Sequence, residues 1–220
     1  MGRRPAVRSG AGKTARAAQP ERSAADRREA ILAAALDVFA ESGFAPARLD
    51  DVAARAGVAK GTIYLYFASK QALFEALVQT SIGGPVAAIG EAMLASDLPT
   101  ADLLRTLFSR VRTEILGTRR REVARLVLSE VGRFPELAAF YHREVVGRGM
   151  ALIRAIARRG VERGELASDA LERFPQLAAA PLVVALLWTS FFDVLEPLDV
   201  EGMFDAHVEI LVRGLQGGRP

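Results

Sequence analysis

The spacing of apolar residues is helical along most of the chain. Ile31, Ala35 and Val38 fall on one face at three- and four-residue intervals, and a second face begins with Leu103 and Leu107. The alternating pattern of apolar and polar residues that is typical of strands is not found. The pattern therefore predicts an all-α protein.

Glycine and proline residues divide this pattern into about nine helices. The breaks fall at Gly43 with Pro46, Gly57 to Gly61, Gly83-Gly84-Pro85, Pro99, Gly117, Pro135, Gly164, Pro175 and Pro197. The first three helices are short, near residues 26–42, 49–56 and 60–67. The later helices are longer and more apolar, so we expect a small head at residues 26–70 and a larger helical body at residues 71–220. The Ser69 hydroxyl is expected to cap the helix that joins them.

Within the head, residues 49–67 are typical of a helix, a glycine-bearing turn and a second helix. Val52, Ala53 and Ala56 face inward, and Val58 with Ile63 can close a small core. Gly57 stands where the first helix ends and a left-handed backbone is required. The second helix is predicted to begin at Lys60.

A helix presented in this way fits the major groove of B-DNA, with its N-terminal residues near base edges. Lys60 and Thr62 are the first candidates for that role. Gly61 allows close approach, Tyr64 and Tyr66 offer hydroxyls to phosphates, and Lys70 supplies a cation. The alternatives are structural, because Tyr64 and Phe67 can pack the head and Lys70 can be a solvated charge at a helix start.

Residues 56–67, Ala-Gly-Val-Ala-Lys-Gly-Thr-Ile-Tyr-Leu-Tyr-Phe, followed by Ala-Ser-Lys-Gln-Ala-Leu-Phe, resemble the signature of TetR-type transcriptional repressors. The resemblance covers roughly residues 26–75. It implies a homodimer whose body binds a small molecule, and it implies DNA contacts from Lys60, Gly61, Thr62, Tyr64, Tyr66 and Lys70. Arg48 is a further candidate for a backbone contact. The family often has Ser or Thr at that position, so Arg48 loses a helix cap that Asp50 and Asp51 can offset through the helix dipole.

The two apolar segments near the end, Leu177 to Leu195 and Val200 to Leu215, are richer in apolar surface than a small body readily hides. Paired across a two-fold axis they would form a four-helix dimer interface and set two heads on a palindromic operator. The alternative is that they are intramolecular core, and His207 on this stripe fits either reading. The helices from 100 to 163 can enclose an effector pocket. The candidate lining residues are Phe108, Arg112, Glu130, Phe134, Tyr141, Trp188 and Phe192.

Charge is concentrated at the start of the chain. Residues 1–28 hold eight Arg and Lys against two acidic residues, although the formal net charge of the whole chain is only +3. Residues 1–25 lack hydrophobic periodicity, which predicts a disordered basic tail. Such a tail either adds affinity for DNA through counterion release or is only solvated.

Composition argues against several other classes of protein. With no cysteine and only two histidines, His142 and His207, we expect no metal site and no cofactor. No paired carboxylates or nucleophile elbow stand at a recognisable spacing, so we do not expect an enzyme. No signal peptide is visible, and the apolar stretch Leu177 to Phe192 is short for a membrane span, so a cytoplasmic protein without a membrane partner is expected.

These observations predict a sequence-specific DNA-binding regulator, a repressor that a small, largely hydrophobic effector releases from its operator. Two rival hypotheses are a small-molecule enzyme and a helical protein-interaction module whose head is only structural. Sequence-specific DNA binding would separate the last of these from the regulator.

Overall fold

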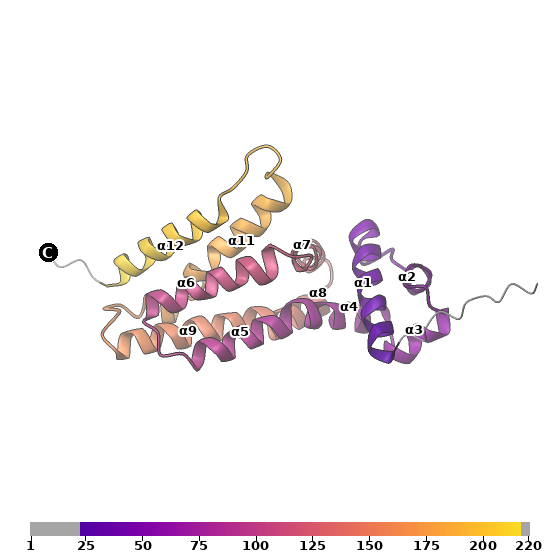
Figure 1. Ribbon diagram of the computed structural model, residues 1–220, viewed down its shortest axis with the longest axis horizontal. Helices are drawn as coiled ribbons and strands as arrows, with labels where there is room; N and C mark the ends of the chain where they lie inside the picture. The colour runs from indigo at the N-terminus through magenta and orange to yellow at the C-terminus, as the bar shows by residue number, and fades with distance from the viewer. Residues whose placement is uncertain (1–22, 217–220) are drawn as a thin grey trace, which may run out of the picture.

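The computed structural model describes residues 23–216, and every regular element within that range is helical (Figure 1). Three helices come first: α1 (Ala24–Ser42), α2 (Leu49–Ala56) and α3 (Lys60–Tyr66). Their bounds agree closely with the predicted helices near 26–42, 49–56 and 60–67. Most of the predicted basic tail, residues 1–22, lies outside the described residues.

Local sequence explains where these short helices begin and end. The Ser23 hydroxyl accepts a hydrogen bond from the Asp26 amide at 3.1 Å, and the Asp26 carboxylate accepts one from the Ser23 amide at 3.1 Å. This reciprocal pair caps the start of α1. Gly43 follows α1 with φ of 79°, and Gly57 follows α2 with φ of 68°, values that residues with a Cβ rarely adopt.

The body is built from longer helices, several of which continue through a π-helical turn. One continuous helix consists of α4 (Lys70–Val78), η1 (Gln79–Gly83) and α5 (Gly84–Leu94), a second of α6 (Thr100–Val111) and η2 (Arg112–Leu116), and a third of α8 (Pro135–Tyr141), η3 (His142–Val146) and α9 (Gly147–Glu162). The others are α7 (Arg120–Glu130), α10 (Ala170–Arg173), α11 (Gln176–Phe191) and α12 (Val200–Leu215). The described residues therefore form about ten continuous helices, against about nine predicted.

The predicted helix break at Gly83-Gly84-Pro85 is wrong, because the helix continues from Lys70 to Leu94. The turn η1 immediately precedes Pro85, which lies in the first turn of α5. A π-helical turn changes the hydrogen-bond register, so a proline that lacks an N–H can follow it without ending the helix. The start of this helix is as predicted: the Ser69 hydroxyl accepts a hydrogen bond from the Ala72 amide at 3.1 Å.

The same helix, Lys70–Leu94, is the one in the described part of the chain that is long and apolar enough to cross a membrane. Its most apolar window is 39% buried inside the protein. Leu73, Phe74 and Val78 belong to the core, and the helix contacts α1, α7 and α9. A core helix passes the same length and composition test.

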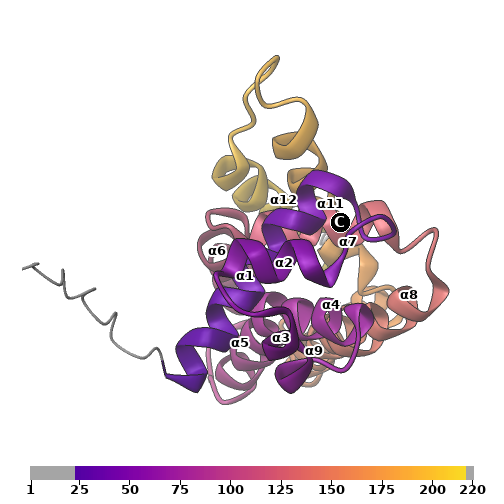
Figure 2. The ribbon, with the colours of Figure 1, turned by 90° about the vertical axis from the view of Figure 1, so that its right-hand side faces the viewer.

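The head lies at one end of the body. In Figure 1 the three helices α5, α6 and α9 run lengthwise beside one another, and α4 leads from them into α1–α3. The helices α11 and α12 cover one side of the bundle, as the end-on view in Figure 2 also shows. Of the two, α12 packs against α6, whereas α11 packs against α7 and α9. An apolar cavity lies inside the body, away from the free surface of α3.

The last two helices are only partly as predicted. The helix α11 ends at Phe191 rather than near Leu195, and the Trp188 indole N–H closes the following turn by donating to the Glu196 carbonyl at 2.7 Å. On α12, the predicted apolar stripe buries Phe204, Val208 and Leu215 within its own body. That stripe is therefore intramolecular core. The helix α11, by contrast, leaves several large apolar residues exposed, namely Leu177, Val183, Val184, Leu187 and Phe191.

Candidate nucleic-acid interface and effector cavity

The turn between α2 and α3 has the geometry that the sequence predicts. Gly57 adopts the left-handed conformation, with φ of 68° and ψ of 35°. The Val58 amide then donates to the Ala53 carbonyl at 3.1 Å, and the Thr62 amide donates to the Ala59 carbonyl at 2.8 Å as α3 begins. Ile63 of α3 is fully buried, which anchors this helix on α2. The opposite face of α3 is left free.

The free face of α3 carries several of the predicted DNA-contacting residues. Lys60, Gly61 and Tyr64 are exposed, and a Cβ added at Gly61 would meet nothing within 4 Å. The Lys60 ammonium lies 2.8 Å from the Asp50 carboxylate, which raises the pKa of Lys60 through that hydrogen bond. Because both partners are exposed, the pair is weak and can open for another anion.

Thr62 and Tyr66 are half-buried, so they serve the head as well as its surface. Tyr66 packs against the core, with its ring centroid 6.4 Å from that of Phe67. Phe67 is buried, which supports its structural alternative. Arg48 is exposed immediately before α2, and its side chain makes no capping hydrogen bond.

Lys70 has a definite structural role in the described residues. Its ammonium donates to the carbonyls of Ala45 at 2.6 Å and Ala47 at 3.1 Å, and it lies 4.8 Å from the centre of the Phe44 ring. Burial lowers its pKa, and the nearby Glu130 carboxylate opposes that shift. Lys70 therefore fixes the loop between α1 and α2, directly before Arg48.

Arg28 is a candidate that the sequence analysis did not single out. It is exposed in the first turns of α1, and its guanidinium lies 5.6 Å from the centre of the Phe67 ring at the end of α3. Only the folded chain brings these two positions, which are distant in the sequence, together. Lys60 and Arg28 thus provide positive charge near the two ends of α3.

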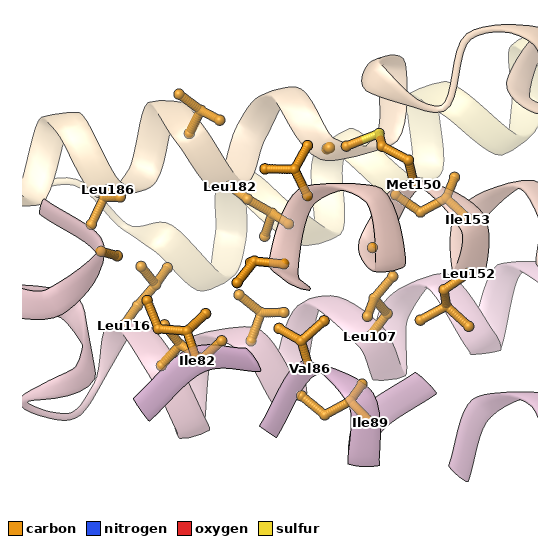
Figure 3. A pocket seen from close by; sticks show the side chains of 18 of the residues that line it. Ile82, Val86, Ile89, Leu107, Leu116, Met150, Leu152, Ile153, Leu182 and Leu186 are labelled. Carbon is orange, nitrogen blue, oxygen red and sulfur yellow. The ribbon is translucent and has the colours of Figure 1, made fainter. Parts of the chain in front are cut away.

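A cavity of about 260 Å³ lies within the body (Figure 3). This volume is close to the lower end of the roughly 300–1,000 Å³ range of small-molecule sites. Aliphatic side chains from η1, α5, α6, η2, α7, η3, α9 and α11 form almost all of its wall. The lining residues are Ile82, Val86, Ile89, Leu107, Val111, Ile115, Leu116, Ala124, Leu128, Tyr141, Val145, Val146, Gly149, Met150, Leu152, Ile153, Ala179, Leu182, Val183 and Leu186.

The wall contains one polar side-chain group, the Tyr141 hydroxyl. Burial raises the pKa of Tyr141, so this hydroxyl keeps its proton at neutral pH. Leu128 and Val183 line the cavity and are also substantially exposed, so the cavity reaches the surface between α7 and α11. Gly149 lines it too, and a Cβ added there would meet no atom within 4 Å.

Of the seven residues predicted to line a pocket, only Tyr141 borders this cavity. Phe108 instead packs on Phe204 with ring centroids 5.0 Å apart, and Arg112 lies 3.3 Å from Glu201 in an ion pair. Trp188 and Phe192 pack on each other beyond the cavity. Helical spacing identifies which face of a helix is buried, but it does not tell whether that face meets another helix or the cavity.

The other two predicted lining residues, Glu130 and Phe134, lie at the junction of head and body. The Glu130 carboxylate is buried and accepts a hydrogen bond from the Phe44 amide at 3.1 Å, while its second oxygen has no partner in the described residues. The rings of Phe44 and Phe134 meet edge to face, with centroids 5.1 Å apart. A Cβ at Gly43 would lie 3.1 Å from the Glu130 carboxylate, so glycine permits this approach.

The helix α7 is attached to the head near both of its ends. Glu130 ends it at the Phe44 contact, and Arg119, just before its start, forms an ion pair with Asp37 on α1. Between these attachments, Ala124 and Leu128 of the same helix line the cavity. The wall of the cavity and the support of the head are therefore parts of one helix.

The histidines do not form a metal centre in the described part of the chain, where no cluster of three or more metal-binding side chains occurs. His207 packs edge to face on Phe108 with ring centroids 5.9 Å apart, and burial lowers its pKa. It belongs to the contact between α12 and α6. His142 is exposed.

Two family models match separate parts of the chain. Residues 31–77 match the family model described as bacterial regulatory proteins, tetR family. Residues 99–194 match a second model of the same group, the tetracyclin repressor-like C-terminal domain. Together the two models extend from α1 to just beyond α11. The chain belongs to the TetR family of transcriptional regulators.

Individual relatives are similar in a short stretch of sequence and in fold. The regulator RutR of Escherichia coli strain K12 is 43% identical over 58 residues, which are 26% of this chain and 27% of RutR. The matched part spans only about a quarter of the length of the first curated relatives, 26% and 27%. The TetR family is one of regulators rather than of enzymes.

Two solved structures of regulators resemble nearly the whole fold. The fatty acid degradation regulator FadR of Bacillus halodurans has a TM-score of 0.69 at 26% identity, covering 85% of this chain and 98% of that one. The regulator FadR of Bacillus subtilis, solved in complex with stearoyl-CoA, has a TM-score of 0.65 at 22% identity and the same coverage. The likeness to the second shows the fold alone.

Proposed function

We propose that the protein is a TetR-type regulator that binds a palindromic operator as a homodimer and is released by a hydrophobic effector. The single observation that carries the DNA-binding part is the free face of α3, with Lys60, Gly61 and Tyr64 exposed beside the anchored Ile63. A helix of this shape enters the major groove, and cations at its ends pair with phosphates. Such a protein would act in the cytoplasm, where bacterial DNA lies.

The proposed DNA contacts on α3 are Lys60, Gly61, Thr62, Tyr64 and Tyr66. Arg48 is proposed as a further contact, and Arg28 is added because its guanidinium lies near Phe67 at the end of α3. Lys70 is proposed to act first by positioning, because its ammonium is committed to the Ala45 and Ala47 carbonyls. Its substitution would then displace Arg48 and the start of α2.

The test of this part is selection of binding sites from random duplex DNA with the purified protein at two salt concentrations. A palindrome that is enriched at both concentrations supports the proposal, because non-specific binding falls steeply with salt. Lys60→Ala and Tyr64→Phe should weaken binding to that duplex while the fold and the oligomeric state stay unchanged. Wild-type affinity in both variants would contradict the assignment of α3 as the reading helix.

The proposed dimer is supported by one exposed stripe on α11. Leu177, Val184, Leu187 and Phe191 are all exposed, and with Ala180 they alternate at intervals of three and four residues. This spacing is typical of a helix that packs along a second helix. A copy of the same stripe, related by a two-fold axis, is the proposed occupant.

Val184→Asp should dissociate the dimer, because it would bury a charge in the middle of that interface. Val161→Asp is the matched control, since Val161 is also an exposed valine on a body helix but lies on α9, outside the stripe. Light scattering after size-exclusion chromatography measures both. A Val184→Asp protein that remains dimeric and folded would place the interface elsewhere.

The proposed effector is an elongated apolar molecule with one polar group. The cavity wall is aliphatic apart from the Tyr141 hydroxyl, which has no hydrogen-bond partner in the described residues and can donate to an acceptor on the effector. The FadR structure with stearoyl-CoA supports long acyl chains as first probes. The site then selects mainly by apolar contact, with one directional bond.

Stearoyl-CoA, free stearate and octadecane are suitable probes, added to the protein bound to its selected duplex. Gly149→Leu should block release by filling the cavity, since a Cβ at Gly149 meets no atom within 4 Å. Tyr141→Phe should weaken release by stearate or stearoyl-CoA and leave any response to octadecane unchanged. Equal responses of Gly149→Leu and wild type would contradict this cavity as the effector site.

The coupling between the two sites is proposed to pass through α7. An occupant that shifts Ala124 and Leu128 would move the Glu130 and Arg119 attachments and with them the spacing of the two heads. A preference of the effector for that arrangement by about 1–3 kcal/mol would lower operator affinity about 5- to 150-fold. A promoter–reporter fusion distinguishes repression, which we propose, from activation.

A further inference from the structure

The exposed face of α3 contains an apolar side chain that the proposed contacts leave unused. Leu65 is 84% exposed, whereas the large apolar side chains elsewhere in the described head are buried or half-buried, apart from its neighbour Tyr64. A single exposed leucine is ordinary on a protein surface. Its place on this particular face is what requires an explanation.

The helical positions around Leu65 leave it unobstructed. Gly61 stands four residues earlier, so it lies on the same face one turn away and presents no side chain of its own. A Cβ at Gly61 would meet nothing within 4 Å, which confirms that the space above this turn is open. On this face of α3, a turn without a side chain at Gly61 is therefore followed, one turn later, by the projecting side chain of Leu65.

The charges around Leu65 indicate what would cover it. Lys60 lies at the start of α3, and the Arg28 guanidinium lies near its end, 5.6 Å from the centre of the Phe67 ring. An exposed apolar side chain on a helix with cations near both ends is complementary to a surface with an apolar group between two phosphate strands. In the major groove of DNA that group is the 5-methyl of thymine, the only apolar substituent on the base edges there.

We propose that Leu65 is a specificity-determining residue that contacts a thymine 5-methyl group in each half of the operator. This inference rests on the proposed DNA-binding function. It adds to that function the recognition of one base, thymine, by apolar contact rather than by a hydrogen bond. Leu65 discriminates thymine from cytosine and from the purines by burying the methyl, while Lys60 and Tyr64 hold the helix in register.

The experiment uses the full-length protein and the duplex selected from random DNA. Each thymine in the half-sites is replaced in turn by deoxyuridine, which removes the 5-methyl group and leaves the base pair intact. Dissociation constants are measured by fluorescence anisotropy for wild type, Leu65→Ala and Leu94→Ala. Leu94 is the matched control, because it is an exposed leucine at the end of α5 in the body, away from α3.

At one thymine in each half-site, deoxyuridine should weaken wild-type binding about fourfold, as expected for one buried methyl group. Leu65→Ala should weaken binding to the thymine duplex by at least that factor and should bind both duplexes equally. Leu94→Ala should behave as wild type. Because Leu65 is exposed, the alanine variant should keep the thermal unfolding midpoint of the wild type.

Two results would overturn the proposal. One is a wild-type protein that binds every deoxyuridine duplex as tightly as the thymine duplex. The other is a Leu65→Ala protein that still distinguishes them as wild type does. If the selection enriches no duplex at all, the proposed DNA-binding function fails at an earlier step, so the two failures are distinguishable.

Discussion

The head and the body treat their apolar residues in opposite ways. In the described part of the head, large apolar side chains are buried or half-buried except on α3, where Tyr64 and Leu65 are exposed. The body contains a cavity of about 260 Å³ and also leaves an apolar stripe on α11 exposed. A closely packed head holds one surface in a fixed shape, whereas a body with unfilled space can adapt to a second molecule.

The two regions meet at Phe44, and its removal should have the largest effect. Phe44→Ala should lower the free energy of unfolding by about 3–5 kcal/mol, because this buried ring packs on Phe39, Phe74 and Phe134. Chemical denaturation measures the loss. Phe174→Ala is the control, since Phe174 is exposed between α10 and α11 and should cost far less. Equal losses would mean that the junction contributes nothing special.

Glu130 tests the polar part of the same junction. Glu130→Ala should destabilise the protein by about 1–3 kcal/mol, because the buried Phe44 amide loses its acceptor. Glu130→Gln keeps that acceptor and removes a buried charge whose second oxygen has no partner in the described residues, so its effect should be close to zero. Denaturation midpoints compare the two. A glutamine variant as unstable as the alanine variant would show that the charge itself is required.

Within the head, substitution of two glycines distinguishes the effect of backbone strain on stability from the effect of a surface contact on DNA binding. Gly57→Ala should destabilise the head by about 1–2 kcal/mol, because alanine is strained at φ of 68°. Gly61→Ala places its Cβ in open space on α3, so it should leave stability unchanged or slightly raised while weakening DNA binding. Thermal unfolding and anisotropy measure the two effects. A stable Gly57→Ala variant would contradict the conformation of the turn.

The smallest expected effect concerns Asp50. Asp50→Asn should strengthen operator binding roughly two- to fivefold, because it frees Lys60 from its ion pair and removes a negative charge near the proposed phosphate contacts. The gain should shrink as salt is raised. Glu75→Gln, an acidic side chain hydrogen-bonded to Gln71 on α4, is the control and should change affinity less. If the affinity of Asp50→Asn for the operator is unchanged, Lys60 does not contribute to the DNA-binding surface.

The sequence predicts the head better than the body for a physical reason. The ends of α1–α3 depend on local chemistry, such as the Ser23 cap and the backbone at Gly57, which neighbouring residues reveal. The packing of the body depends on which helix faces contact one another, and helical periodicity does not predict those contacts. Phe108 and Trp188 thus face other partners than the cavity, and Pro85 continues a helix because a π-helical turn precedes it.

Lys70 and Glu130 show the same limit at the scale of single residues. The sequence predicts a DNA contact for Lys70 and a place in the pocket wall for Glu130, and it indicates neither of their contacts with Phe44. Their roles arise because distant segments converge on Phe44, which stacks under the Lys70 ammonium and donates its amide to the Glu130 carboxylate. No spacing rule relates residues 44, 70 and 130.

The cavity has a consequence for how the protein responds to hydrostatic pressure. Space that the folded chain leaves unfilled disappears when the chain unfolds, so pressure favours unfolding in proportion to that volume. An aliphatic wall with one hydroxyl offers water few hydrogen-bond partners, so water is not expected to fill the cavity. A molecule seated between α7 and α11 should make the fold resist compression, so pressure titration can detect an effector without any DNA.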